Sequence, residues 1–338
     1  MTANAVIFGC EGLSLTDWER EFFADSDPLG FILFARNCEG PEQIRALVAD
    51  LRESVGQGSA PVLIDQEGGR VARLKPPQWR AAPAAGRFGL LAGRDRQLAE
   101  QAVQLNARLI AAELLDLGIT VNCAPVLDLP TPGASDVIGD RAFGADPERI
   151  AELGRAFCEG LLAGGVLPVI KHIPGHGRAR VNSHHELPVV ETPRAELEVS
   201  DFRPFVALAG MPWAMTGHLV YAAIDPDNPA TMSHAVIAEV IRGAIGFDGV
   251  LVTDDLSMAA LSGDFAARAS KSLAAGCDVV LHCNGKAAEM TATMGGVGPL
   301  SAETVRRLAA AGARPQAPEE VDTAALAARL ERILEHGG

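Results

Sequence analysis

The sequence predicts a single (β/α)8 barrel, an α/β fold of TIM type, and two features of the 338-residue chain lead to this prediction. The first is a series of eight short apolar runs, each bounded by glycine, proline or polar residues. Their hydrophobicity is continuous rather than alternating, which is typical of parallel strands covered on both faces. The second is the alternation of these runs with helical patterns, which favours a closed barrel over an open doubly wound sheet.

Each apolar run is too short for a buried helix, so we assign each one to a strand. In chain order the predicted strands are residues 5–10, 31–37, 61–66, 119–128, 167–172, 213–220, 249–255 and 278–284.

The clearest predicted helix covers residues 96–118, where leucines and alanines recur at steps of three and four and therefore share one face. Gly118 supplies a natural C-terminal stop for this helix. Similar patterns occupy residues 41–58, 146–165 and 233–246. We expect the residues from about 285 onward to form helices that close the barrel, so that one catalytic domain covers residues 1–338.

The composition excludes several classes of partner. Acidic residues outnumber basic residues by 43 to 29, and a net charge of −14 repels nucleic acid. No apolar stretch approaches the ~20 residues of a membrane-spanning helix, and the N-terminus lacks the pattern of a signal peptide, so we expect a cytoplasmic protein without a membrane partner. The six cysteines are scattered without a CxxC motif, which favours reduced, buried thiols over disulfides or zinc.

Polar residues gather at the predicted strand ends, where barrel enzymes place their active sites. The third to eighth strands end near Asp65, Asp128, the pair Lys171 and His172, His218, the pair Asp254 and Asp255, and Asn284. These groups should converge on one polar pocket. We interpret Asp128, Asp255 and Asn284 as caps of the following helices or as structural partners.

Four segments resemble the signatures of the family 3 glycoside hydrolases. They are IDQEGGRVARL (64–74), IGDRAFG (138–144), KHIPGHGRARVNSHHELP (171–188) and VTDDLSM (252–258), and FILFARN and MTGHLVYAAID fit the same pattern. The resemblance is greatest to the single-domain cytoplasmic β-N-acetylhexosaminidases. It implies a retaining exo-β-N-acetylglucosaminidase that removes terminal β-linked GlcNAc from peptidoglycan fragments such as GlcNAc–anhydroMurNAc peptides. It implies no cofactor and a small carbohydrate substrate. The sequence does not determine the oligomeric state, and we expect a monomer.

The same resemblance implies the catalytic residues. Asp254 matches the nucleophile, a role that suits a carboxylate because it can attack an oxocarbenium-like carbon and leave again. A helix cap is the alternative for this carboxylate, and that role better fits Asp255. His184 matches the general acid/base on the loop after the fifth strand, and a histidine with an ordinary pKa of about 6.5 can exchange a proton near neutrality. Spacing alone would not separate His184 from its neighbour His185, which we expect at the surface.

Asn182 departs from the family pattern, which has an aspartate two residues before the catalytic histidine. An asparagine can accept a hydrogen bond from the imidazole, but it cannot supply the negative charge that stabilises the protonated ring. Three interpretations remain open. The chain is a slowed enzyme, such as a variant engineered to trap a bound sugar; or it is a natural variant in which His184 has another partner; or it is a sugar-binding protein that has lost activity.

The resemblance also implies the substrate-binding residues, which are Asp65, Arg73, Arg141, Lys171 and His172. A salt bridge at the barrel mouth is the alternative for Lys171. Among the neighbouring residues, we expect Arg70 to be structural, His176 to shape the loop by hydrogen bonding, and Arg178 and Arg180 to be exposed. His218 fits a structural and a pocket-lining role equally well.

A metal-dependent barrel hydrolase is the rival class, because Lys171, His172, His218 and Asp254 could surround a metal ion. Such enzymes place two metal-binding histidines at the end of the first strand, and residues 5–10 contain none. His172 and His176 are four residues apart, but the intervening Pro-Gly pair prevents a helical ligand pair. The sequence therefore favours a site without metal.

Overall fold

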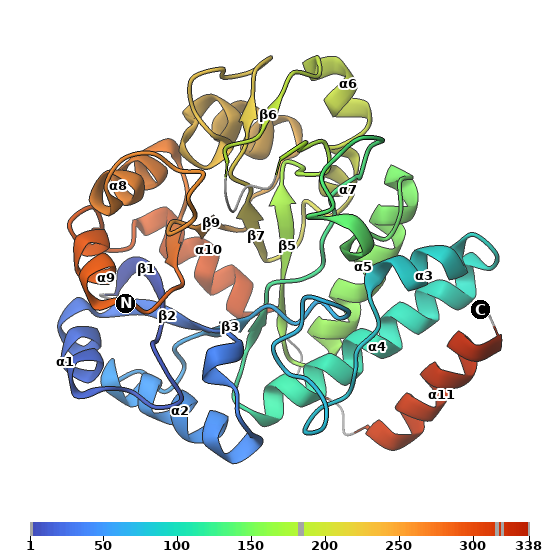
Figure 1. Ribbon diagram of the computed structural model, residues 1–338, viewed down its shortest axis with the longest axis horizontal. Coiled ribbons are helices and arrows are strands. Elements are labelled where there is room, and N and C mark those ends of the chain that lie inside the picture. The colour runs from blue at the N-terminus through green and yellow to red at the C-terminus, as the bar shows by residue number, and fades with distance from the viewer. Residues whose placement is uncertain (1–2, 182–185, 315–317, 319–320, 337–338) are drawn as a thin grey trace.

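Eight parallel strands close into a barrel in the computed structural model of the chain (Figure 1), which describes residues 3–181, 186–314, 318 and 321–336. The strands pair in the order β1–β10–β9–β7–β5–β4–β3–β2, and β2 pairs with β1 to complete the circle. The predicted (β/α)8 barrel is confirmed. The barrel strands are β1 Asn4–Gly9, β2 Pro28–Leu33, β3 Val62–Ile64, β4 Val121–Asn122, β5 Leu167–Ile173, β7 Trp213–Thr216, β9 Val250–Asp255 and β10 Val279–His282.

Each predicted apolar run overlaps one of these strands, but the sixth run is divided. Only Trp213–Thr216 belongs to the barrel, whereas β8 (Val220–Tyr221) pairs with β6 (Val189–Val190) in a separate two-stranded sheet. The backbone bends at His218 between the two strands. Because both strands are apolar and buried on at least one side, the hydrophobic pattern continues through this bend and does not reveal it.

The helices follow the strands around the outside of the barrel (Figure 1). The α-helices are α1 Asp17–Ser26, α2 Pro41–Ser54, α3 Ala85–Ala92, α4 Arg96–Asp116, α5 Pro147–Ala163, α6 Arg194–Val199, α7 Arg203–Ala207, α8 Phe265–Ala275, α9 Ala287–Met294, α10 Ala302–Gly312 and α11 Thr323–His336. The 3₁₀ segments are η1 Ala35–Asn37, η2 Gly139–Arg141 and η3 Ala230–Met232, and η4 Val236–Ala244 is a π-helix within the predicted helix 233–246.

Aspartates define the start of several of these helices. The side chains of Asp95, Asp146 and Asp264 accept backbone N–H groups in the first turns of α4, α5 and α8. Such caps satisfy donors that have no partner within the helix. At the other end of α4, Gly118 has a φ of +78°, as a C-terminal glycine stop requires.

The barrel has two buried apolar layers, one inside the strands and one between strands and helices. In β1, Ile7 belongs to the interior cluster, whereas Val6 and Phe8 pack outward. Side chains alternate across a strand, so a barrel strand covered by helices must be apolar on both faces. This double burial explains the continuous hydrophobicity of the predicted strands.

The C-terminal helices occupy different positions on the barrel. Ala311 of α10 is buried in the interior cluster, with Leu308 packed beside it, while α11 lies along α4 (Figure 1). The assignment of residues 1–338 to one domain stays a prediction. All six cysteines are free, as expected, and five of them are buried. Within the described residues, no helix combines the length and the apolar character that a membrane crossing requires.

Candidate active site

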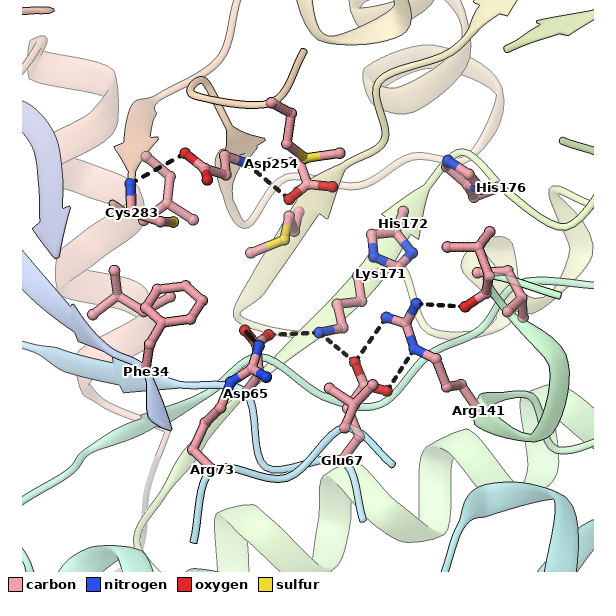
Figure 2. A pocket seen from close by; sticks show the side chains of 18 residues that line it. Phe34, Asp65, Glu67, Arg73, Arg141, Lys171, His172, His176, Asp254 and Cys283 are labelled. Carbon is pink, nitrogen blue, oxygen red and sulfur yellow. Dashed lines mark hydrogen bonds and ion pairs between the residues drawn. The ribbon is translucent and has the colours of Figure 1, made fainter. Parts of the chain in front are cut away.

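A cavity of about 270 Å³ lies at the carboxyl ends of the barrel strands (Figure 2). Its wall combines charged groups from several loops with apolar side chains. The polar lining residues are Asp65, Glu67, Arg73, Arg141, Lys171, His172, His176, Asp254 and Asp255. The apolar lining residues are Ile32, Phe34, Val71, Val137, Ile138, Met215, Met258, Leu281 and Cys283.

The fold brings together six of the predicted site residues. All of them line this cavity although they come from four different strand ends: Asp65, Arg73, Arg141, Lys171, His172 and Asp254. The other two predicted catalytic positions, Asn182 and His184, lie outside the described residues. Their roles stay predictions.

Asp254 is half-buried at the end of β9, and its Oδ1 accepts the N–H of Asp255 at 2.8 Å. Burial raises the pKa of Asp254, but the nearby His218 and His172 and this N–H have a larger, opposite effect. The pKa of Asp254 therefore lies below its usual value. The carboxylate is therefore ionised near neutral pH. Among the described residues, no side chain donates a hydrogen bond to it, which leaves an anionic oxygen available in the cavity.

Asp255 does not cap a helix, so the helix-cap role expected for it was wrong, whereas its alternative as a structural partner agrees with the structure. Its carboxylate accepts hydrogen bonds from the N–H and hydroxyl of Ser257 and from the N–H of Cys283. Residues 256–261 form turns, and α8 begins only at Phe265 with Asp264 as its cap. Asp255 instead ties the ends of β9 and β10 together beside Asp254. Asn284 accepts the N–H of Lys286 just before α9, in agreement with a structural role.

The opposite wall of the cavity is an ion-pair network (Figure 2). Lys171 Nζ lies 2.8 Å from Asp65 Oδ1 and 2.7 Å from Glu67 Oε1. Arg73 Nη2 donates to Asp65 Oδ2 at 2.9 Å, and Arg141 donates from Nε and Nη2 to the two oxygens of Glu67, each at 2.9 Å. The salt bridge expected as the alternative for Lys171 is present, in a position where Lys171 also faces the cavity.

The network keeps its members charged. Burial raises the pKa values of Asp65 and Glu67, but nearby cations lower both below their usual values. These cations are Lys171 and Arg73 for Asp65, and Lys171 and Arg141 for Glu67. Burial lowers the pKa of Lys171, and the two carboxylates more than reverse this effect. Three cations and two anions therefore stand close together in a buried wall, which presents fixed donors and acceptors to a polar ligand.

Glu67 is the member of this network that the sequence analysis did not identify. It stands two residues after Asp65 in the DQEGG segment. In extended backbone, residues two apart point to the same side, so this spacing was the available signal. Its importance depends on Arg141, which follows it by 74 residues and which no local pattern connects to it.

Lys171 and His172 both face the cavity, although neighbouring side chains in a regular strand point to opposite faces. The pairing of β5 with β7 shifts register between Lys171 and Ile173. This irregularity at the end of β5 coincides with the two consecutive cavity-lining side chains.

Asp128 was expected to cap a helix or to be a structural partner, and the structure shows the second of these roles. Its carboxylate is fully buried, and its Oδ2 lies 2.6 Å from His172 Nδ1. Its Oδ1 accepts the N–H groups of His172 and His176 at 3.1 and 2.7 Å. Burial raises the pKa of Asp128, but His172 and His176 lower it to about 2. Asp128 therefore holds the two histidines as a buried anion.

His176 lines the cavity, where burial and the neighbouring His172 lower its pKa to about 4. It is therefore neutral near pH 7. His218 lies behind the cavity wall, with Nδ1 2.8 Å from Thr231 Oγ1 and Nε2 3.0 Å from the carbonyl oxygen of Asp255. His218 is thus a structural neighbour of the cavity and does not line it.

The other arginines give two confirmed expectations and one incorrect expectation. Arg180 is exposed, as expected. Arg70 is structural, because it donates to Asp140 and to the carbonyl oxygens of residues 136–138. Arg178 was expected to be exposed, but it is half-buried and pairs with the buried Asp201 and with Glu196. A long side chain in a polar loop gives no local indication of a buried partner 23 residues away.

Within the described part of the chain, no group of three or more His, Cys, Asp or Glu side chains has an arrangement that could hold a metal ion. The four residues considered for a metal site do not form one set, since His218 faces Thr231 and a backbone carbonyl rather than the cavity. Lys171 is held between two carboxylates.

Comparison with known proteins agrees with this geometry. Residues 13–315 match the glycosyl hydrolase family 3 N terminal domain. The β-hexosaminidase of Alkalilimnicola ehrlichii is 42% identical over 288 residues, which are 84% of this chain and 82% of that protein.

Solved structures are similar over almost the whole chain. NagZ from Neisseria gonorrhoeae, in complex with N-trifluoroacetyl-D-glucosamine, has a TM-score of 0.85 and 31% identity, covering 100% of this chain and 98% of that one. A family 3 β-N-acetylglucosaminidase from Paenibacillus sp. str. FPU-7 has a TM-score of 0.84 and 31% identity, covering 97% of this chain and 66% of that longer one. The chain therefore belongs to glycosyl hydrolase family 3, among the β-hexosaminidases of that family, as its motifs predicted.

Proposed function

We propose that this protein is a retaining exo-β-N-acetylglucosaminidase that acts through a covalent glycosyl-enzyme on Asp254. The observation that supports this function is the state of the cavity carboxylates. Asp65 and Glu67 are engaged by cations, and Asp255 by two residues of neighbouring turns. Asp254 alone among these four carries an ionised oxygen without a side-chain donor in the described residues. A retaining glycosidase requires such a carboxylate nucleophile.

The size of the cavity supports the removal of a single terminal sugar. Its volume of about 270 Å³ is slightly below the ~300–1,000 Å³ of typical ligand pockets. One pyranose ring suits this space better than an extended oligosaccharide does. The charged wall of Asp65, Lys171 and Arg141 would bind the hydroxyl groups of that ring, with Arg73 and His172 beside them.

In the proposed first step, an oxygen of Asp254 bonds to the anomeric carbon while the bond from this carbon to the glycosidic oxygen breaks. His184 donates its proton to the departing oxygen. In the second step, neutral His184 takes a proton from water, the water oxygen bonds to the anomeric carbon, and Asp254 leaves. The amide of Asn182 would orient the imidazole without stabilising its positive charge, so we propose that the protonated state is less favoured and turnover is slow.

The proposed natural substrate is terminal β-linked GlcNAc on GlcNAc–anhydroMurNAc peptides in the cytoplasm. This assignment rests on the similarity to NagZ and on the cavity for one sugar. It predicts that the purified protein releases GlcNAc from such a muropeptide more efficiently than from a β-linked glucose analogue, with GlcNAc release measured by chromatography.

A fluorinated N-acetylglucosaminide with a good leaving group tests the covalent step. We expect the protein to gain the mass of one fluorosugar, and peptide mapping to place it on the segment 252–258 at Asp254. The Asp254→Ala variant should gain no mass. Labelling of another side chain would exclude Asp254 as nucleophile.

Asn182 favours a second candidate function, a sugar-binding protein that no longer cleaves. The two functions separate in a long incubation with a chromogenic aryl N-acetyl-β-glucosaminide. Slow release of the aryl alcohol supports the enzyme, whereas GlcNAc binding by calorimetry without any release supports the binding protein. Addition of EDTA tests the metal-dependent rival, because chelation should leave a glycosidase of the proposed type unchanged.

A further inference from the structure

The buried carboxylate of Asp128 joins the loops that follow two neighbouring strands. It follows β4 and accepts three hydrogen bonds from two residues at the end of β5 or just after it. Its side chain is fully buried and does not line the cavity, whereas the ring of His172 does. Asp128 can therefore act on a ligand only through His172 or His176.

The geometry determines which ring nitrogen of His172 carries the proton. An ionised carboxylate only accepts hydrogen bonds, so a contact of 2.6 Å between Asp128 Oδ2 and His172 Nδ1 requires a proton on Nδ1. In a neutral imidazole the other nitrogen, Nε2, is then an acceptor. Among the described residues, no group hydrogen-bonds to Nε2 of His172.

A neutral acceptor would complement the rest of the cavity wall. The cationic groups of Arg73, Arg141 and Lys171 can only donate hydrogen bonds, and the carboxylates of Asp65 and Glu67 are largely occupied by them. A sugar hydroxyl donates one hydrogen bond as well as accepting others. A wall of donors therefore needs nearby acceptors for the hydroxyl protons.

We propose that Asp128 is a positioning residue that holds His172 in its Nδ1–H tautomer, so that Nε2 accepts a hydrogen bond from a hydroxyl of the bound sugar. This inference rests on the proposed function of the cavity as a sugar site. Asp128 itself does not touch the sugar. Metal-binding histidines are oriented in the same way by carboxylates in many proteins, and loss of such a partner costs about 10–100-fold in affinity or activity.

A purely structural role for Asp128 is the alternative, because Oδ1 also accepts the backbone N–H groups of His172 and His176. The two roles separate because the ring bond uses Oδ2 and the backbone bonds use Oδ1. An Asp128→Asn substitution can keep its amide oxygen on the two backbone N–H groups. Its NH₂ group then faces Nδ1 of His172, where two donors cannot meet, so the ring proton must move to Nε2.

The test is ¹⁵N NMR of histidine-labelled protein at pH 8, combined with GlcNAc binding by calorimetry and kcat/KM on an aryl N-acetyl-β-glucosaminide. A His172→Gln sample assigns the His172 signals. We expect the Nδ1–H tautomer in the unmodified protein and the Nε2–H tautomer in Asp128→Asn. In that variant we expect GlcNAc affinity and kcat/KM to fall about 10–100-fold, while the circular dichroism spectrum is unchanged.

Asp278→Asn is a matched control, because Asp278 is also a buried carboxylate, paired with Arg242 and Arg307 away from the cavity. It should lower stability without changing the His172 tautomer or kcat/KM at a temperature where it is folded.

Three results would overturn the proposal: an Nε2–H tautomer or a doubly protonated ring at His172 in the unmodified protein, an unchanged tautomer in Asp128→Asn, or unchanged GlcNAc affinity in that variant. The measurement on the unmodified protein needs no variant to fold. If the unmodified protein shows the expected tautomer but neither binds nor cleaves GlcNAc derivatives, the proposed function fails separately.

Discussion

Arg141 and Glu67 form a bidentate ion pair, in which Nε and Nη2 of the guanidinium each donate a hydrogen bond of 2.9 Å to a different carboxylate oxygen. The exposed fractions of the two side chains are 11% and 6%. The same carboxylate lies 2.7 Å from Lys171 Nζ. Glu67 therefore fixes two cations that face the proposed sugar, and this relationship leads to the first prediction.

Glu67→Gln should lower both stability and activity. The substitution removes the negative charge between Arg141 and Lys171, and the loss of one partner from a buried ion pair costs about 3–5 kcal/mol. We expect a drop of about that size in the free energy of unfolding by urea, with kcat/KM lower by about 10–100-fold.

Glu148→Gln provides the comparison for this variant. Glu148 pairs with Arg203, and their side chains are 59% and 48% exposed. A surface pair of this kind contributes about 0–1 kcal/mol, and this one lies outside the cavity lining. Equal losses of stability in the two variants would contradict the importance of the buried network.

Asn182→Asp should raise kcat by restoring a negative charge beside the proposed acid/base His184. In the serine-protease aspartate–histidine pair, replacement of aspartate by asparagine costs about 10⁴-fold in turnover, and we take this value as an upper limit here. Asn182→Ala should lower kcat below that of the unmodified protein, because it removes the amide oxygen as well. A rate that is the same for Asp, Asn and Ala at this position would exclude residue 182 from the mechanism.

His176→Gln should reduce the loss of stability in acid. Burial and the nearby His172 lower the pKa of His176 from 6.5 to about 4. Between these values the unfolded chain binds more protons than the folded protein, so the free energy of unfolding falls as the pH drops from 6.5 to 4, by about 3 kcal/mol for this one group. Glutamine has no such ionisation.

Urea unfolding at pH 6.5, 5.5 and 4.5 checks the prediction for His176. On unfolding, the variant should bind fewer protons than the unmodified protein, by at most one. Its free energy of unfolding should therefore depend less steeply on pH. His218 and His282 also have lowered pKa values and should leave a residual slope in both proteins. Parallel curves for the two proteins would show that His176 is not the group responsible.

Gly177→Ala should destabilise the loop after β5. A Cβ atom at Gly177 would lie 1.9 Å from the carbonyl oxygen of Leu129 and 2.2 Å from its carbonyl carbon, so backbone must move. Overpacking of this kind costs about 1–3 kcal/mol. Because Leu129 directly follows Asp128, a shift of the Leu129 backbone should also displace Asp128, which we propose positions His172. We therefore also expect a lower kcat/KM.

Gly210→Ala is the control, since a Cβ atom there has no neighbour within 4 Å in the described structure. Thermal unfolding and the aryl glycoside assay compare the two variants. A Gly177→Ala protein as stable and active as Gly210→Ala would show that the close approach to Leu129 is not required.

The sequence by itself determined the barrel, because strands such as 249–255 are buried on both faces and therefore appear as continuous apolar runs. It also located the end of the barrel that carries the polar cavity, since the polar residues Asp65, Lys171 and Asp254 lie at the ends of apolar runs. Helix starts at Asp95 and Asp146 are local as well, because a cap bonds to residues only two or three positions ahead.

The tertiary structure decided which of these polar groups act on one another. Glu67 and Arg141 are 74 residues apart, and Asp128 and His172 are 44 residues apart. No local spacing distinguishes such partners from helix caps, which is why the sequence left both roles open for Asp128. Closure of the barrel places the ends of β3, β4 and β5 side by side, and only this arrangement brings each buried charge to the partner that offsets its loss of hydration.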